Sequence, residues 1–257
     1  KNRTFHSILH AHKILMVTSN GEEVLQDLNR VVIDSSICFN DFAVNSRGDI
    51  VLLSDDKITV IYSAGESKDF MFPKAAESDV VGQWRNSVAV DSNDNVYAVT
   101  RRTTREENGI KSELVLYVFD ESYNIRRVSI LDCDDGKRYS DVKIAVDKNQ
   151  NLVVITDWND KVYVSDNTGK LKFQFDQDAR GFSSLDISNN NDIMIASDDL
   201  SAVKVYSIEG NLKFTIEVPE DHEVLRVAFH HGIGKIIVLT YVRKHDSWFL
   251  LCYSEKG

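Results

Sequence analysis

The sequence lacks the features of membrane proteins and of disulfide-bonded scaffolds. No apolar run approaches the ~20 residues that a bilayer-spanning helix needs. The first residues, Lys-Asn-Arg-Thr-Phe-His, contain no apolar stretch of the kind that secretory signals have. The three cysteines, Cys38, Cys133 and Cys252, lie far apart and match no metal-knuckle spacing, which indicates reduced, structural thiols. We therefore expect a cytoplasmic protein that does not bind membranes.

Positive charge is also scarce. The 30 Lys and Arg residues are outnumbered by 40 Asp and Glu residues, so the net charge is −10 at pH 7. General binding to a phosphate backbone needs a field of Lys and Arg, and this composition argues against it. A local basic patch on an acidic body remains compatible with the sequence.

Motifs of common enzymes are missing as well. The sequence contains no G-x-S-x-G elbow, no H-E-x-x-H helix and no glycine-rich phosphate loop. Asp55, Asp157 and Asp198 follow apolar runs and could form a carboxylate-ringed calcium site. Arg101 and Tyr241 occupy the equivalent positions of other repeats, which favours carboxylates that accept backbone N–H groups at strand ends. We expect no cofactor, no small-molecule substrate and no enzymatic activity in this chain.

The sequence does contain a repeat of four apolar residues followed by a hydroxyl. Successive copies lie about 36 to 56 residues apart, a period typical of radially repeated folds. The copies end at Thr18, Ser54, Thr100, Thr156, Ser197 and Thr240. A continuous apolar run of this length predicts a strand that is buried on both faces.

Further strands surround each apolar run. A short strand precedes five of the runs, at Phe42-Ala-Val44, Val88-Ala-Val90, Ile144-Ala-Val146, Leu185-Asp-Ile187 and Val227-Ala-Phe229. The links between the two strands, such as "NSRGD" and "DSNDN", are rich in turn residues. "VYVSDNTGKLKFQF" (162–175) shows a third strand, a turn and a fourth strand. Each repeat is thus predicted to be a four-stranded antiparallel meander.

The predicted fold is an all-β, six-bladed β-propeller of four-stranded blades, in which the central strand of each blade is buried between neighbouring blades. A two-sheet sandwich is disfavoured by six repeats in the same phase. A single propeller is expected over 1–257, with blades at about 5–34, 41–73, 86–131, 142–176, 183–218 and 225–257. The first blade is compact and the last lacks a fourth strand. Either residues 1–4 supply a fragment of that strand, or the chain is a piece of a longer protein.

"VAVDSNDNVYAVT", "IAVDKNQNLVVIT" and "VLYVFDESYNI" resemble NHL repeats. The resemblance extends over essentially the whole chain. The chain is most similar in its motifs to the NHL regions of invertebrate tripartite-motif (TRIM-NHL)-like proteins. It implies a β-propeller that binds protein or RNA, downstream of a RING and a B-box that this chain does not contain. Any ubiquitin-ligase activity would therefore reside outside this chain. The sequence departs from the family in lacking most Asn-Arg pairs and in carrying an insertion, "RRTTREENGIKSE".

One face of the predicted propeller, here called the loop face, carries the links from second to third strands and from fourth strands to the next first strands. Arg and aromatic residues are common anchors of protein interfaces. Those on the loop face form the candidate partner-binding set: Trp84, Arg85, Arg101, Arg102, Arg105, Trp158, Arg180, Phe182, Arg243 and Lys244. Carboxylates share this face, so its charge is mixed.

Four histidines form a second, weaker candidate. His10, His12, His230 and His231 lie in first-to-second-strand links of blades that become neighbours when the ring closes. Imidazoles that converge in this way can hold Zn²⁺ or Cu²⁺, although histidines in surface turns usually have no such role.

These observations favour a non-enzymatic module that recognises a protein segment on the loop face. RNA binding by the same face, through Arg beside stacking aromatics, is the first alternative. A hydrolase or lyase with a central metal is the second.

Overall fold

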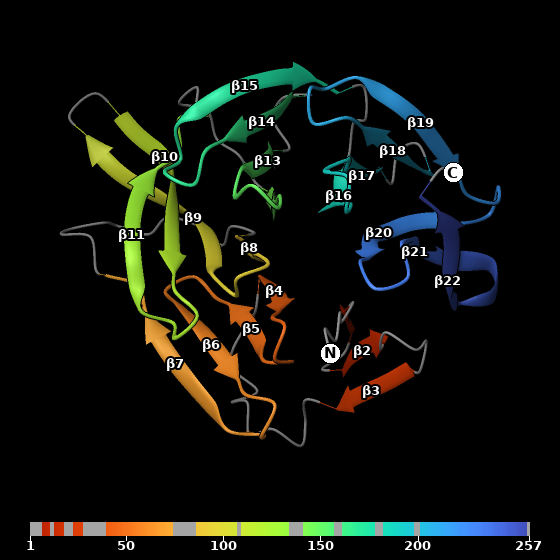
Figure 1. Cartoon of the computed structure of the whole chain (residues 1–257), viewed down its shortest axis with the longest axis horizontal. Helices are drawn as coiled ribbons and strands as arrows, with labels where there is room; N and C mark the ends of the chain where they lie inside the picture. Colours follow the sequence, from red (N-terminus) through yellow and green to blue (C-terminus); the bar gives the residue numbers. More distant parts are fainter. Residues whose placement is uncertain are drawn as a thin grey trace.

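Antiparallel sheets are arranged around a central axis, as Figure 1 shows in a view down that axis. The structure is a computed structural model that describes residues 7–10, 13–17, 23–27, 40–73, 86–106, 109–133, 141–156, 161–177, 182–197 and 201–255. Side chains are described from residue 40 onward, except at 104–106, 109–110 and 182–183. The predicted all-β propeller with four-stranded antiparallel blades is confirmed.

Four blades have four strands each, and neighbouring strands of a blade are consecutive in the chain. The first comprises β4 (Asp41–Val44), β5 (Ile50–Leu53), β6 (Lys57–Ile61) and β7 (Ser67–Met71). The second comprises β8 (Ser87–Val90), β9 (Val96–Glu106), β10 (Gly109–Phe119) and β11 (Ile125–Ile130). The third comprises β12 (Val142–Val146), β13 (Leu152–Thr156), β14 (Lys161–Ser165) and β15 (Leu171–Asp176). The fourth comprises β16 (Phe182–Ile187), β17 (Ile193–Ser197), β18 (Ala202–Tyr206) and β19 (Leu212–Glu217).

The last blade has three strands within the described residues. It comprises β20 (Glu223–His230), β21 (Lys235–Val242) and β22 (Ser247–Ser254), with the 3-10 turn η2 (Arg243–His245) between β21 and β22. Consecutive blades contact one another through their innermost strands, from β4 to β8, β12, β16 and β20.

The prediction of six blades is wrong, because the structure shows five. The segment predicted as the compact first blade forms a separate three-stranded sheet of β1 (Ser7–His10), β2 (Lys13–Val17) and β3 (Glu23–Asp27). In Figure 1, β2 and β3 lie in the arc between β4–β7 and β20–β22. These short strands carry the expected apolar run, but they form no four-stranded meander in the described residues.

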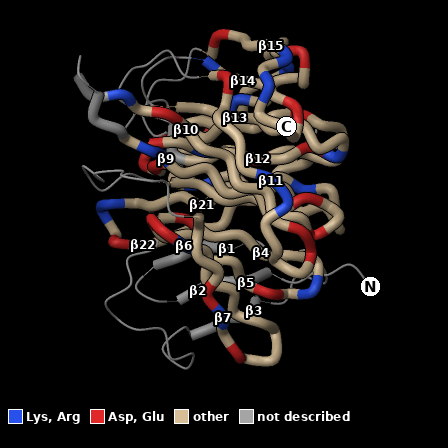
Figure 2. The backbone as a smooth tube through the Cα atoms, turned by 90° about the vertical axis from the view of Figure 1, so that its left-hand side faces the viewer, with Lys and Arg blue, Asp and Glu red and all other residues tan. Residues whose placement is uncertain are grey.

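The second departure concerns the insertion "RRTTREENGIKSE". It is not an irregular loop: β9 and β10 continue through it as a long hairpin whose register runs to Glu106 opposite Gly109. In Figure 2 this hairpin projects from one side of the ring, and β22 lies at the same side. Both hairpins join a second strand to a third, so both belong to the loop face.

The second strands form the core, as their apolar runs predicted. Every residue of β5, β13 and β17 is buried, and Val154 and Ile195 are fully so. Each apolar cluster joins residues of two adjacent blades, such as Val51 of β5 with Val96 and Val115 of the next blade. Burial on both faces explains why these strands show no polar alternation.

Two cysteines lie in the described residues, and both are free thiols, Cys133 buried and Cys252 exposed. Within the described ranges, no helix has the length and apolar character needed to cross a membrane.

Side chains of the innermost strands bond to the backbone of the following blade. The Asp41 carboxylate accepts the Ser87 hydroxyl at 2.7 Å and the Val88 N–H at 3.3 Å. Ser87 Oγ in turn accepts the Ile144 N–H at 3.2 Å, so a chain of bonds links β4, β8 and β12. The edge of an innermost strand would otherwise leave these N–H groups without an acceptor.

The same device joins the fourth blade to the last. Ser184 Oγ donates to the Val227 carbonyl at 3.2 Å, and Asp186 accepts the Phe229 N–H at 2.7 Å. Arg226 of β20 lies 3.8 Å from the Asp41 carboxylate of β4, so a charge interaction connects the last blade with the first of the five.

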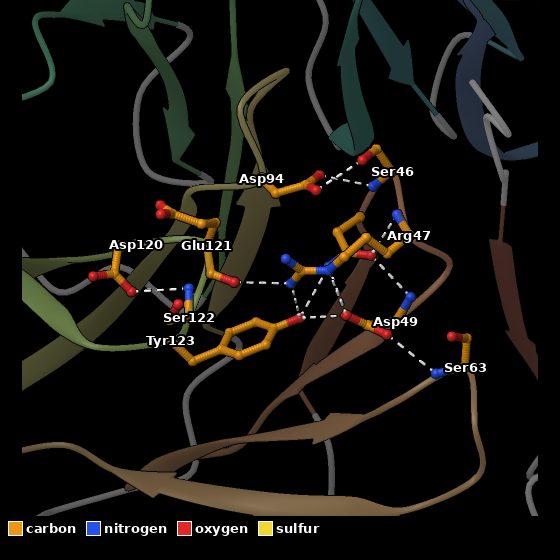
Figure 3. A network of polar contacts seen from close by, with 10 residues as sticks. Ser46, Arg47, Asp49, Ser63, Asp94, Asp120, Glu121, Ser122 and Tyr123 are labelled. Carbon is orange, nitrogen blue, oxygen red and sulfur yellow. Dashed lines mark hydrogen bonds and ion pairs between the residues drawn. The ribbon is translucent and has the colours of Figure 1, made fainter. Parts of the chain in front are cut away.

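A polar network ties the first two blades together at the opposite end of the innermost strands (Figure 3). The Asp49 carboxylate accepts bonds from Asn45 Nδ2, the Ser63 N–H, Arg47 Nε and the Tyr123 hydroxyl, at 3.0 to 3.1 Å. Tyr123 belongs to the neighbouring blade. Burial alone would raise the pKa of Asp49, but these four bonds hold it below its usual range.

Tyr123 itself has an unusual backbone conformation. Its φ is +64°, and Gly65, Gly169 and Gly210 occupy the same place in other third-to-fourth-strand turns with φ of +87° to +93°. A bulky side chain in this region is strained by roughly 1–2 kcal/mol. The ring is almost fully buried and packs against Tyr62 and Phe70, and these contacts offset that strain.

Replacing Ser87 by Ala tests the inter-blade bonds. The change leaves the Ile144 N–H without its acceptor and removes one donor from Asp41, so we expect a loss of about 1–3 kcal/mol in the free energy of unfolding. Urea denaturation gives the value. Ser92→Ala, in an exposed turn, is the control and should change stability by less than about 0.5 kcal/mol. Equal stability of the two variants would contradict the structural role of Ser87.

Asp49→Asn tests the network of Figure 3 through pH. A carboxylate whose pKa is lowered by folding stabilises the protein above its unfolded pKa of about 3.9, and this contribution is lost as pH falls through the folded pKa. The variant should therefore be less stable than the original protein at pH 7, and the difference should shrink below about pH 4. Urea unfolding of both proteins at several pH values measures it, with exposed Asp56→Asn as the control for net charge. A difference independent of pH would exclude the ionised network.

Candidate functional site

The innermost strands enclose a cavity along the axis of the ring. It is lined by residues of β4, β8, β12, β16 and β20 and has a volume of about 610 Å³. Small-molecule sites in proteins commonly have volumes of roughly 300–1,000 Å³. The cavity is therefore large enough for a small organic molecule.

Five polar side chains occupy equivalent positions in this cavity, one from each blade. Each stands immediately before the three-residue strand that the sequence predicted as the first strand of its repeat. We call this set the polar ring: Asp41, Ser87, Lys143, Ser184 and Arg226. The polar ring was not predicted, although an alignment of the five predicted first strands would have brought these residues into one column.

Two members of the polar ring carry positive charge into the cavity. Lys143 is only 7% exposed, and its Nζ lies 3.9 Å from Asp141 Oδ1. Arg226 Nη1 lies 3.8 Å from Asp41 Oδ1. Both separations exceed hydrogen-bond length, so each cation is balanced by a carboxylate but keeps N–H donors that no carboxylate in the described part of the chain accepts.

A second layer lies two residues further along the strands. Ala43, Ala89, Ala145 and Ala228 occupy four of its positions, and Asp186 occupies the fifth. Burial raises the pKa of Asp186, while the nearby His231 and the N–H groups of Phe229 and Ile187 act in the opposite direction. The small residues leave space in the cavity. The Asp186 side chain extends into part of this space and accepts the Phe229 N–H of the next blade.

The loop face holds the predicted partner-binding residues that the structure describes. Arg101 and Arg102 lie within β9 and not in a loop, because the hairpin is longer than the sequence suggested. Arg101 Nη2 donates to Ser112 Oγ at 2.7 Å, and Arg102 pairs with Glu113 at 2.7 Å. Both side chains are half-buried against β10 and are already engaged within their own blade.

Arg243 and Lys244 lie in η2, at the tip of the β21–β22 hairpin, and both are exposed. Arg243 pairs with Glu223. Trp248 and Phe249 follow on β22 and are 44% and 41% exposed. We call these four residues, Arg243, Lys244, Trp248 and Phe249, the hairpin patch.

Neighbouring rings hold the aromatic part of the hairpin patch in place. The Trp248 ring centroid lies 5.0 Å from that of Tyr241, and the Phe249 ring lies 5.0 Å from that of His222. The sequence analysis named the two basic residues but missed the aromatic pair. The signal available was the position of Trp248 and Phe249, directly after the basic turn.

The remaining predicted residues are not placed by the structure. Trp84, Arg85, Trp158 and Arg180 lie outside the described residues, and for Arg105 and Phe182 only the backbone is described. The described part of the set therefore falls into two groups, on the β9–β10 and β21–β22 hairpins, which lie on well-separated blades in Figure 1.

Asp55 bonds to its own and the neighbouring blade, but through side-chain amides and not through the backbone N–H groups that the interpretation of these carboxylates expected. Its Oδ1 accepts Asn40 Nδ2 at 2.7 Å and Asn86 Nδ2 at 3.3 Å. The other two candidates for a calcium site, Asp157 and Asp198, lie outside the described residues.

The histidine candidates can be followed only in part. His10 is described by its backbone in β1, and His12 lies outside the described residues. His230 is buried, whereas exposed His231 bonds to Asn189 Oδ1 at 2.7 Å. Among the described residues, no group of three or more His, Cys, Asp or Glu side chains is arranged to hold a metal ion.

Comparisons with known proteins support the fold. No protein-family model matches the chain, and no curated protein matches it either. A Bacteroides caccae protein of unknown function superposes with a TM-score of 0.67 at 12% identity, over 100% of this chain and 92% of that one.

Two further structures are similar. A catalytically inactive virginiamycin B lyase from Staphylococcus aureus, with quinupristin, superposes with a TM-score of 0.57 at 12% identity. The match covers 99% of this chain and 85% of the lyase chain. Regucalcin, a calcium-binding protein from Agrobacterium tumefaciens, superposes with a TM-score of 0.58 at 14% identity. The match covers 92% of this chain and 77% of the regucalcin chain. At such identities the likeness concerns the fold alone, and the chain is a β-propeller built from repeats.

Proposed function

We propose that this β-propeller is a non-enzymatic binding module that recognises a protein segment on its loop face, centred on the hairpin patch. The observation that carries the proposal is the exposure of two aromatic side chains, Trp248 and Phe249, on the two faces of β22, a strand that closely follows two exposed cations, Arg243 and Lys244. Large aromatic side chains are costly to leave in water, and they are enriched together with Arg at the centres of protein interfaces.

The chemistry of the hairpin patch defines the partner. The aromatic rings offer apolar area, and the contacts to Tyr241 and His222 restrict their rotation before a partner arrives. The cations favour carboxylates. A segment with one or two apolar side chains flanked by Asp or Glu would complement this surface.

The NHL-like motifs agree with this proposal. "VAVDSNDNVYAVT" and the related repeats support an NHL-type propeller that serves as the partner-recognition domain of a larger, cytoplasmic, tripartite-motif-like protein. Such propellers bind through the loops on one face. In this chain the β9–β10 and β21–β22 hairpins project from the loop face.

RNA binding by the loop face is the second candidate, favoured by Arg101 and Arg102. Both arginines are already bonded to β10, and Figure 2 shows basic and acidic residues interspersed along the described chain without a continuous basic band. Together with the net charge of −10, this arrangement favours protein as the partner.

Selection of peptides on the purified protein tests the proposal. A displayed library of random peptides should yield binders enriched in apolar residues next to Asp or Glu. Synthetic copies of these binders should lose at least about tenfold in affinity for Trp248→Ala/Phe249→Ala, because hot-spot aromatics contribute roughly 1.4 kcal/mol or more.

The matched control is Val128→Ala/Ile130→Ala, which removes two exposed apolar side chains from the outer strand β11. Its affinity for the same peptides should be unchanged. Peptides that bind all three proteins equally would place the site elsewhere. Tight binding of a random RNA pool that weakens steeply with added salt, and is lost in Arg101→Ala/Arg102→Ala, would establish the RNA alternative instead.

A further inference from the structure

We propose that the polar ring binds a small carboxylate ligand inside the axial cavity, at a site distinct from the hairpin patch. The inference concerns Lys143 and Arg226, which line the cavity together with Ser87 and Ser184. It is independent of the peptide recognition proposed above.

The cations of the polar ring lack a close ion-pair partner within the described residues. Burying an ammonium group is expensive unless it is paired and hydrogen-bonded. Lys143 is nine-tenths buried, yet among the described residues its nearest ion-pair partner is 3.9 Å away. A ligand carboxylate at the polar ring would supply the short, charge-assisted acceptor that Asp141 does not provide.

The polar ring also supplies hydrogen-bond donors. Arg226 carries five N–H donors, and its ion pair with Asp41 is too long for a hydrogen bond. Asp41 accepts the Ser87 hydroxyl and the Val88 N–H on Oδ2, and its Oδ1 is the atom that lies 3.8 Å from Arg226. Within the described residues, the two cations of the polar ring therefore keep N–H donors beyond those that its single carboxylate engages, and such donors favour an anion.

Next to the polar ring, the cavity is lined by apolar and small side chains. The next residues along the strands form an apolar layer, and the layer after it is mostly alanine. The apolar layer consists of Phe42, Val88, Ile144, Leu185 and Val227. A ligand could place its carboxylate at the ring and its hydrocarbon part against these side chains, within a volume of about 610 Å³. Small organic acids fit this combination of a charged end and a short apolar body.

Thermal unfolding with simple probes tests the inference. Acetate, succinate and citrate are compared with neutral acetamide, at constant ionic strength because salt alone changes surface electrostatics. A ligand that binds only the folded protein raises Tm, by about 3–6 °C at ten times its Kd for a domain of this size. At least one carboxylate should produce such a rise, and acetamide should not.

Lys143→Met and Arg226→Gln locate the effect. Each should weaken carboxylate binding at least about tenfold, since a charge-assisted hydrogen bond contributes roughly 1.5–3 kcal/mol. Arg226 is about one-third exposed, so its replacement preserves folding better than that of Lys143 and keeps the test valid if Lys143→Met unfolds. Each variant is measured against its own Tm without ligand.

Lys204→Met is the matched control. The exposed fraction of Lys204, 8%, is close to the 7% of Lys143. Lys204, however, lies on β18 and does not line the cavity. The carboxylate-induced rise should survive in this variant. The inference is overturned if no carboxylate raises the Tm of the original protein, if acetamide acts equally well, or if Lys143→Met and Arg226→Gln retain the full rise.

Discussion

The structure depends on one constraint, which is that the innermost strand of each blade has an unpaired edge facing the axis. Its backbone N–H groups are buried away from bulk water and need acceptors. In this chain the acceptors are side chains of the preceding blade: Asp41 for Val88, Ser87 for Ile144 and Asp186 for Phe229. These bonds fix the order and the spacing of the blades, and the apolar clusters then form between second and third strands of adjacent blades.

The same constraint shapes the functional surfaces. Because polar side chains are needed near the axis, the cavity is not purely apolar, and two of its five ring positions carry cations. The loop face is free of this requirement, so its hairpins can vary in length. The β9–β10 hairpin uses its arginines within its own blade, whereas the β21–β22 hairpin exposes basic and aromatic residues together. The two proposed sites follow from these two different environments.

Most of the fold could be predicted from the sequence, because burial on both faces leaves a clear pattern. The runs at Val51 and Val154 are apolar throughout for this reason. Blade number was not predictable in the same way. "ILMVT" has the local pattern of a second strand, but a local pattern does not determine whether a segment completes a four-stranded meander. The insertion was read as a loop, although Asn108-Gly109 is a strong hairpin signal that should have outweighed its many charges.

The candidate site was predicted only in part. Arg243 and Lys244 lie on an exposed hairpin tip, as expected for residues in a second-to-third-strand link. Arg101 was expected on a loop, because charge alone does not show where a hairpin ends. In the structure it lies on β9 and bonds to the neighbouring strand β10. Trp248 was not among the predicted residues, because the sequence of a strand does not show whether an aromatic ring on it is buried or exposed. The polar ring depends on register between blades, and the spacing of single repeats does not reveal register.

Native-state hydrogen exchange at the N–H groups of Val88, Ile144 and Phe229 tests the central constraint most directly. If side chains of the preceding blade hold these groups, they can exchange only when blades separate. Their free energies of exchange should then equal the global free energy of unfolding from denaturant titration, as is found for the most protected core amides. Exchange at these three positions as fast as that of the exposed turn residue Ser92 would contradict the account.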